Sequence, residues 1–307
     1  MAGASGAIGR PLVPKLIAAG HDVTGMTRSE ESAARLREAG AAALVTDVFD
    51  EDRVRSGMVE AAPEVVVHQL TSLPDRLDFR DKQLYDATNR VRGEGTRILI
   101  DAARNAGARR MVAQSIAFIY ASEGDWVKDE DAAVMSDSGD GFGRATRVVT
   151  EMEQAVVGAD GLEGLVLRYG FFYGPGTYYA AGGTSAEDVR KRRLPLVGKA
   201  TGTVSFIHVD DAADATVAAV ERGAPGIYNV VDDDPAQFNE WLPVYADAVG
   251  AKKPFRVPVW LAKIVAGKAV ARFTNELRGA SNGKAKRELG WEPSYPSWRQ
   301  GFREALG

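Results

Sequence analysis

The sequence predicts an α/β fold in which a doubly wound parallel sheet carries a smaller C-terminal lobe. Short β-branched runs such as "PEVVVHQL" and "RRMVAQS" alternate with long helical stretches, for example the one from about residue 78 to residue 106. This alternation is typical of parallel strands joined by crossover helices. Three helical stretches end at Gly20, Gly40 and Gly107, directly before a strand. Glycine there can adopt the left-handed conformation that ends a helix.

The composition is that of an ordinary globular protein and excludes several classes of function. The chain has 307 residues, 45% of them hydrophobic, and a formal net charge of -4. We therefore expect no nucleic-acid partner, which would need a concentrated basic face. The absence of cysteine excludes thiolate chemistry, and the three scattered histidines show no metal-binding spacing. No apolar run is long enough to span a membrane, and we expect a cytoplasmic protein.

The segment "GASGAIG" at residues 3–9 has the GxxGxxG spacing of a dinucleotide-binding turn. Gly3 permits the tight turn, Gly6 lets backbone amides approach a pyrophosphate, and Gly9 lets the helix pack closely. The free amides at the helix start then favour phosphate. The predicted phosphate-binding residues are Gly3, Ser5, Gly6, Ala7, Ile8 and Gly9.

The end of the next strand, "GMTRS", indicates which dinucleotide binds. Thr27 and Arg28 stand where an acidic residue would hold the ribose diol of NAD. A guanidinium beside hydroxyls suits a 2′-phosphate, so the sequence favours NADP, with NAD as the alternative. Asp47 and Val48 end the third strand of this rhythm and are predicted to face the adenine.

The later part of the chain changes character. Residues 170–205 are rich in Gly, Tyr and Thr, and the strand pattern fades after "GIYNVVDDDP". We predict a dinucleotide-binding domain over residues 1–168 plus 204–231 and a substrate lobe over 169–203 plus 232–307. The stretch "VWLAKIVAGKAVARF" is interrupted by charges and predicts an amphipathic surface helix.

At this level of detail the chain resembles the extended short-chain dehydrogenase/reductase superfamily, within its NAD-dependent epimerase/dehydratase group. The resemblance is carried by "GASGAIGR", "VVVHQLTS", "GTRILIDAARNAG", "LRYGFFYGPG", "FIHVDDAA" and "YNV". It implies a Rossmann-type core, a small-molecule substrate and pairing of two copies through helices of that core. It also implies that the nicotinamide lies near Gln69, Leu70, Thr71, Tyr169 and Phe172.

Members of this family carry a hydrophobic first strand before the glycine turn, whereas only Met1 and Ala2 precede it here. A missing first strand would leave two neighbouring strands without a shared partner, and unpaired backbone groups are costly to bury. Our hypothesis is that the start is assigned too late or that the polypeptide is shortened.

The family's acid–base pair, Tyr-x-x-x-Lys, is replaced. Its two positions fall on Phe142 and Thr146, and Arg92 stands where relatives often have asparagine. Loss of a positioned acid or base typically costs about 10²–10⁴-fold in rate. Other groups must act if the protein turns over, and the predicted catalytic residues are Ser115 and Tyr173. The predicted substrate-pocket residues are Tyr120, Phe142, Tyr178 and Arg193.

Two further predictions concern structural residues: Arg168 braces the end of the sheet, and His208 and Asp210 cap the helix that follows.

The leading function is NAD(P)-dependent oxidoreductase or isomerase chemistry on a small, partly apolar carbonyl or hydroxyl compound. It would proceed by hydride transfer in a non-standard active site that contains no metal. A non-catalytic NADP-binding sensor is the alternative, and an interaction protein without cofactor is a third reading.

Overall fold

The computed structural model describes residues 1–78, 81, 83–136 and 139–306. Its centre is a parallel sheet whose four strands lie in the order β11 (Gly226–Val230), β6 (Glu163–Tyr169), β4 (Arg110–Ile116) and β3 (Val65–His68). A second parallel pair, β1 (Thr24–Thr27) with β2 (Ala42–Val45), continues it. The predicted α/β fold with a doubly wound parallel sheet is thereby confirmed.

Ala2 joins these two groups of strands. Its amide donates to the carbonyl of Val67 (2.8 Å) and its carbonyl accepts from the amide of Gln69 (2.9 Å). On the other side, the amide of Met26 donates to the carbonyl of Met1 at 2.7 Å. The expected first strand is thus represented by two residues, which bridge β1 and β3. The hypothesis about where the polypeptide starts stays a hypothesis.

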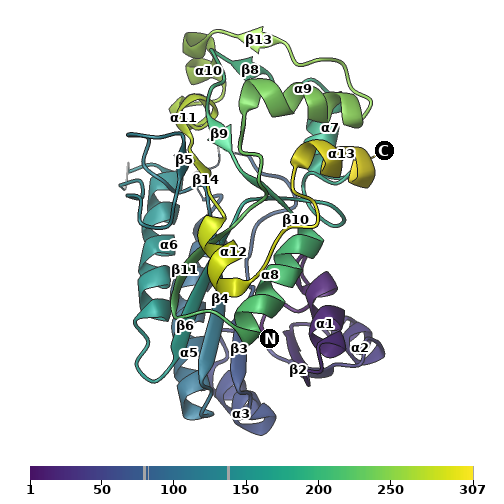
Figure 1. Cartoon of the computed structure of the whole chain (residues 1–307), viewed down its shortest axis with the longest axis vertical. Coiled ribbons are helices and arrows are strands. Elements are labelled where there is room, and N and C mark those ends of the chain that lie inside the picture. Colours follow the sequence, from purple (N-terminus) through teal and green to yellow (C-terminus); the bar gives the residue numbers. More distant parts are fainter. Residues whose placement is uncertain (79–80, 82, 137–138, 307) are drawn as a thin grey trace.

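Helices cover both faces of the sheet (Figure 1). On one face, α1 (Gly9–Ala18), α8 (Val209–Glu221) and α12 (Gly283–Leu289) share a core with Val67, Val112 and Leu165. On the other face, α3 (Glu51–Ala61) and α5 (Thr96–Asn105) pack on Val66, Met111 and Val166. The long α6 (Gly141–Val157) packs against β4 and β6, and α2 (Glu30–Glu38) lies beside β1 and β2. Adjacent residues of one strand point to opposite faces, which explains the two cores.

A smaller lobe lies above the carboxyl ends of the strands (Figure 1). Its aromatic core contains Tyr173, Phe206, Trp241, Trp298 and Phe302. The strands of this lobe are β7 (Phe171–Tyr173), β8 (Leu196–Val197), β9 (Thr203–Val204), β10 (Phe206–His208), β12 (Ala236–Gln237) and β13 (Arg256–Val257). Its helices are α7 (Thr184–Arg190), α9 (Phe238–Ala248), α10 (Val259–Val265), α11 (Lys268–Glu276) and α13 (Trp298–Leu306). Beside it, β5 (Val127–Lys128) pairs with β14 (Gly279–Ala280), and the following α12 returns to the large sheet. The predicted domain boundaries stay predictions.

Several local expectations can be compared with the structure. Gly20, Gly40 and Gly107 have φ values of 91°, 89° and 75°, so all three end their helices in the left-handed conformation as predicted. The single amphipathic helix expected over residues 259–273 is wrong: Gly267, with φ 93°, divides it into α10 and α11.

The helical stretch expected from about residue 78 begins later. Its described helices are α4 (Asp86–Arg90), the π-helix η1 (Val91–Gly95) and α5, while residues 79–80 and 82 lie outside the described part. The cap of α8 is His208, whose Nδ1 accepts from the amide of Asp210, so the expected side-chain cap by Asp210 is wrong. Within the described residues no helix has the length and apolar character needed to cross a membrane.

Candidate active site

The glycine turn connects directly to α1 and lies against the end of β3. Gly3 has φ 87°, and a Cβ atom there would lie 2.6 Å from the carbonyl oxygen of Gln69. A Cβ atom on Gly9 would lie 2.3 Å from the carbonyl oxygen of Gly3. No side chain caps the start of α1, and its first turn carries no acidic residue. Only glycine fits these two positions, and the helix start is left with the features that bind a pyrophosphate.

The predicted adenosine contacts lie at the ends of β1 and β2. Thr27 is buried and the next residue, Arg28, is exposed. Ser29 caps α2 through its Oγ. Asp47 is exposed, and its Oδ1 accepts from the amide of Phe49 at 3.0 Å, whereas Val48 is buried. In parallel α/β sheets, ligands bind at this carboxyl edge, where the strand order reverses.

The end of β3 supplies the predicted nicotinamide side. Gln69 is buried, and its Nε2 donates to the hydroxyl of Tyr169 at 3.1 Å, while its Oε1 has no hydrogen-bond partner within the described part of the chain. The Tyr169 hydroxyl also bonds Thr216 (2.7 Å), and the Tyr169 ring centroid lies 5.3 Å from that of Phe172. Leu70 is half-buried and Thr71 is exposed. The orphaned Gln69 oxygen, together with the glycine cradle, fits a dinucleotide that offers amide or hydroxyl donors.

His68 holds this loop in place. Its Nδ1 accepts from the amide of Leu70 at 3.2 Å, so the ring proton belongs on Nε2, 2.9 Å from Thr96 Oγ1. Burial lowers the pKa of His68 to about 4, and the nearby Arg92 charge acts in the same direction. The imidazole is therefore neutral at physiological pH.

Ser115 and Tyr120 belong to a buried polar network. Ser115 Oγ donates to Glu153 Oε1 at 2.5 Å, and Glu153 also accepts two bonds from Arg168, at 2.6 and 2.8 Å. A third Arg168 nitrogen donates to the Tyr120 hydroxyl, which itself donates to Asn229. Arg168 thus braces β6 against α6 as expected. The catalytic role of Ser115 stays a prediction. Its hydroxyl is already bonded to the buried carboxylate of Glu153.

The structure places Tyr173 inside the core of the smaller lobe. Its side chain is fully buried between Phe206, His208 and Phe302. Its hydroxyl has no hydrogen-bond partner among the described residues and faces Gly301 of α13. Burial raises the pKa of Tyr173 far above its ordinary value. The role of Tyr173 as a proton donor stays a prediction, and the structure encloses its side chain among aromatic rings.

Phe142 and Thr146, the positions predicted for the family's acid–base pair, carry no acid. Thr146 is fully buried, and its hydroxyl donates to the backbone carbonyl of Phe142 at 3.0 Å. The Phe142 ring lies 6.4 Å from that of Phe118 and 6.1 Å from that of Phe273. Phe171 closes the circuit, at 4.4 Å from Phe118 and 6.0 Å from Phe273.

We call these four half-buried rings, together with Tyr85, the aromatic cluster. The Tyr85 ring lies 6.1 Å from that of Phe142. The sequence pointed to this region through Phe142 and the motif "YGFFYGPG", which contains Phe171. Tyr85, Phe118 and Phe273 were missed, because they come from three separate segments with no motif of their own.

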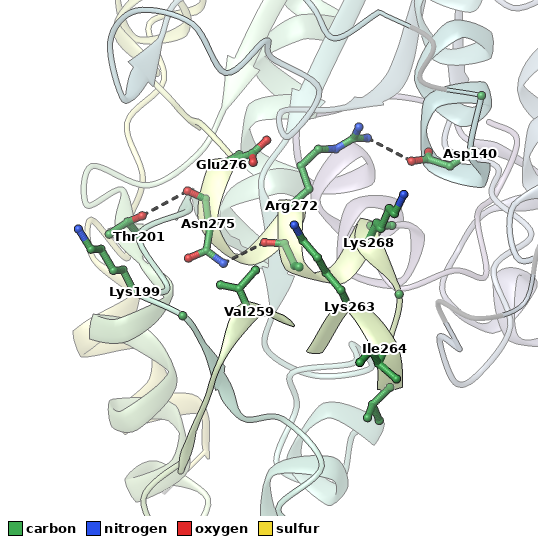
Figure 2. A pocket seen from close by; sticks show the side chains of 17 residues that line it. Asp140, Lys199, Thr201, Val259, Lys263, Ile264, Lys268, Arg272, Asn275 and Glu276 are labelled. Atoms are coloured by element: carbon green, nitrogen blue, oxygen red, sulfur yellow. Dashed lines mark hydrogen bonds and ion pairs between the residues drawn. The ribbon is translucent and has the colours of Figure 1, made fainter. Parts of the chain in front are cut away.

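A pocket of about 1250 Å³ lies between α10, α11 and the residues that lead into α6 (Figure 2). None of the five rings of the aromatic cluster lines it. Arg272 and Asp140 form an ion pair in the wall of this pocket, with 3.3 Å between Arg272 Nη2 and Asp140 Oδ2. Arg272 immediately precedes Phe273, and Asp140 lies two residues before Phe142.

Lys263 and Lys268 also line the pocket. With Lys199 and Arg272, these lysines outnumber the two carboxylates of the lining, Asp140 and Glu276, so the pocket is attractive to an anionic group.

The two remaining predicted pocket residues lie elsewhere. The Tyr178 hydroxyl donates to the carbonyl of Pro74 at 2.5 Å. Arg193 is exposed and faces Asp188 at 3.4 Å. Neither lines the pocket in Figure 2. The part of the chain that the structure describes contains no group of side chains suited to a metal ion.

Comparisons with known proteins agree with this geometry. Residues 1–230 match the NAD dependent epimerase/dehydratase family. The chain is 48% identical over 305 residues to the 3-diazoavenalumate denitrifying reductase of a Streptomyces species, covering 98% of each chain. It is 25% identical over 314 residues to the 4-hydroxy-2-methyl-3-oxo-4-farnesyl-3,4-dihydroquinoline-1-oxide ketoreductase of Stigmatella aurantiaca, covering 94% of this chain and 90% of that one. Its fold is similar to that of the UDP-glucose 4-epimerase of Thermotoga maritima, with a TM-score of 0.76, 20% identity and coverage of 99% and 96%.

Proposed function

Because the chain belongs to the NAD dependent epimerase/dehydratase family, we propose that it is an NAD(P)-dependent reductase that removes the diazo group of an aromatic carboxylate. The Streptomyces relative is named as a denitrifying reductase of a diazo carboxylate. A role as a reductase agrees with the names of both reductase relatives. The diazo substrate is proposed from the name of the Streptomyces relative and from the residues of the candidate site.

The proposal is supported by the aromatic ring of Phe142 and the absence of an acid at the two positions predicted for the family's acid–base pair. Carbonyl reduction needs a proton for the developing alkoxide, and a positioned acid contributes about 10²–10⁴-fold. Phe142 has no proton to give, and the Thr146 hydroxyl is bonded within its own helix. A substrate whose reduction protonates no oxygen would lose nothing by this replacement.

An arenediazonium ion is such a substrate. A reduced nicotinamide held by the glycine turn and Gln69 would supply the hydride. The terminal nitrogen of the diazonium would accept it, which would give an aryl diazene and leave the cofactor oxidised. The carbon–nitrogen bond of the diazene then breaks, N2 leaves, and the hydrogen ends on the ring carbon. The electrons balance as one hydride per N2 released. The protein's task is to hold the ring and exclude water.

The side chains of the candidate site suit those tasks. The aromatic cluster presents ring faces, which attract both a flat ring and a cationic diazonium group. Lys263 and Lys268 in the adjoining pocket suit the carboxylate. The glycine turn and Gln69 would hold the dinucleotide.

The test compares two substrates with the intact protein. An arenediazonium carboxylate and the matching aryl ketone carboxylate are each mixed with NADPH or NADH, and cofactor absorbance and N2 are measured. We expect one N2 per cofactor oxidised, above a protein-free control, and no turnover of the ketone. Turnover of the ketone alone would favour a carbonyl reductase, and tight cofactor binding without any turnover would favour the sensor.

Cofactor preference is a separate proposal, for NADP over NAD, and it depends on Arg28. The change Arg28→Glu replaces an exposed cation at the end of β1 with a carboxylate that repels a 2′-phosphate. A charged hydrogen bond contributes about 1.5–3 kcal/mol, so NADPH affinity should fall by about tenfold or more while NADH affinity is unchanged. An unaltered NADPH affinity would contradict the NADP assignment.

A further inference from the structure

The large hydrophobic side chains that stay exposed are concentrated in one short segment. In the described part of the chain ten such side chains are exposed, and five of them lie within residues 255–265. We call these five the apolar tip: Phe255, Trp260, Leu261, Ile264 and Val265. Trp260, Ile264 and Val265 are 64%, 74% and 67% exposed. A concentration of this kind marks a surface that another molecule covers.

The opposite side of α10 holds the apolar tip in place. Ala262 is buried there with Val197 and Ala271, and Val259 packs against the same group. The core of this region is therefore filled without the side chains of the apolar tip. In Figure 1, α10 and β13 lie at the upper end of the smaller lobe, far from the large sheet. The apolar tip thus lies at an extremity of the molecule, which a flat surface can approach.

The charges beside the apolar tip are positive. Between Asp247 and Glu276 the sequence has six cations and no carboxylate, although the whole chain has a net charge of -4. Arg192 adds a further cation, since its guanidinium carbon lies 5.3 Å from the centre of the Phe255 ring. Four of the six are exposed lysines that form no ion pair with any described residue: Lys252, Lys253, Lys263 and Lys268.

We propose that the apolar tip and these four lysines dock on an anionic lipid bilayer. Exposed apolar side chains enter the boundary between headgroups and acyl chains, where tryptophan is especially common. The long stems of the lysines let their ammonium groups reach the headgroups at the same time. Spread positive charge suits a surface of spread negative charge, because no cation needs a partner at a fixed position.

The charges disfavour the other occupants of this surface. In a two-fold dimer formed through the apolar tip, the lysines of one copy would face the same lysines of its partner. Such like charges oppose association. An acidic protein would neutralise them, but lysine is depleted at protein–protein interfaces, where arginine is enriched. Lysine beside exposed apolar residues is instead the composition of segments that bind anionic membranes.

The docking surface adjoins the pocket in Figure 2, because Lys263, Ile264 and Val265 belong to both. Two carboxylates line that pocket, Asp140 and Glu276, and its cations outnumber them. Docking would therefore bring the rim of the pocket to the headgroups without placing net negative charge against them. The inference does not rest on the proposed function, and its test needs no turnover.

The test measures binding of the intact protein to lipid vesicles. The protein is floated with vesicles of phosphatidylcholine alone, or of phosphatidylcholine with phosphatidylserine, at low and at physiological ionic strength. We expect binding to the vesicles that contain phosphatidylserine, and we expect this binding to weaken as the salt concentration rises. Equal binding to both kinds of vesicle, or binding to neither, would overturn the inference.

Two variants divide the apolar and the electrostatic contributions. Ile264→Ser should weaken binding to the anionic vesicles by about tenfold, because an apolar side chain no longer enters the lipid. Lys263→Gln should weaken it by about fivefold, the contribution of one cation near such a surface. Both side chains are exposed, so the melting temperature should not change.

Matched controls come from α3, at the other end of the molecule (Figure 1). Val59→Ser removes an exposed apolar side chain and Arg53→Gln removes an exposed cation, and neither should alter vesicle binding. Equal losses in the control variants and in the variants of α10 would overturn the inference.

The remaining occupants give results of their own. Binding to polyglutamate without binding to either vesicle would assign the surface to an acidic protein. A dimer that forms as the protein concentration rises, and that Ile264→Ser abolishes in sedimentation velocity, would assign it to a second copy of this chain. Either result would overturn the bilayer as the occupant.

Discussion

Acidification should destabilise this protein through His68. The residue is 2% exposed, and its ring is fixed by the amide of Leu70 on Nδ1 and by Thr96 on Nε2. A proton added to Nδ1 would break the bond from Leu70 and place a charge in an apolar site near Arg92. The perturbation is a change from pH 7 to pH 5, applied to the wild-type protein and to His68→Gln.

The magnitude follows from the difference in pKa between the folded and unfolded chain. Burial lowers the pKa of His68 from 6.5 to about 4. Between these values the unfolded chain binds a proton that the folded chain does not, so stability falls as the pH falls. The full difference corresponds to about 3 kcal/mol, of which about 2 kcal/mol is lost by pH 5.

The assay is urea unfolding followed by tryptophan fluorescence at both pH values. Other titrating groups, such as Asp211 and Asp232, whose pKa values are raised by burial, are present in both proteins and cancel in the comparison. The wild type should lose about 2 kcal/mol more than His68→Gln between pH 7 and pH 5. Equal losses in the two proteins would refute the reasoning.

Three further predictions concern single side chains. Tyr173→Phe removes a buried hydroxyl without a partner, so unfolding free energy should change by less than about 1 kcal/mol and turnover should persist; a loss of about 10²-fold in kcat would instead support Tyr173 as the acid. Glu153→Gln leaves Arg168 buried without its carboxylate and should cost about 3–5 kcal/mol in urea unfolding, whereas an unchanged midpoint would contradict the bracing role. Gly9→Ala forces a Cβ against the carbonyl of Gly3, so calorimetric titration should show NADPH affinity lowered by about tenfold or more, and normal affinity would remove the glycine turn from the site.

Local chemistry made the larger architecture predictable. The glycines at the helix ends have the positive φ values expected of them, because that conformation depends mainly on the residue itself. The parallel sheet was predictable from the alternation of strand and helix patterns, because the spacing of apolar side chains follows from the backbone geometry of each element. The absence of an acid at Phe142 and Thr146 was also readable, because residue identity alone decides whether a proton is available.

Roles that depend on burial and on distant partners were not readable in this way. Ser115 looked available in "VAQS", yet its hydroxyl is bonded to Glu153, which lies 38 positions later. Tyr173 looked close to the nicotinamide, yet the chain folds its ring against α13, near the end of the sequence. A hydroxyl's reactivity depends on what surrounds it, and those neighbours are brought by the tertiary fold.

The sequence by itself determined the parallel sheet and the glycines of the predicted dinucleotide turn, because each follows from residue type and short-range spacing. Only the tertiary structure decided which rings meet in the aromatic cluster and that the Ser115 hydroxyl is bonded to Glu153. Pairing and desolvation depend on the sum of all neighbours in space, and those neighbours come here from segments as far apart as Tyr85 and Phe273.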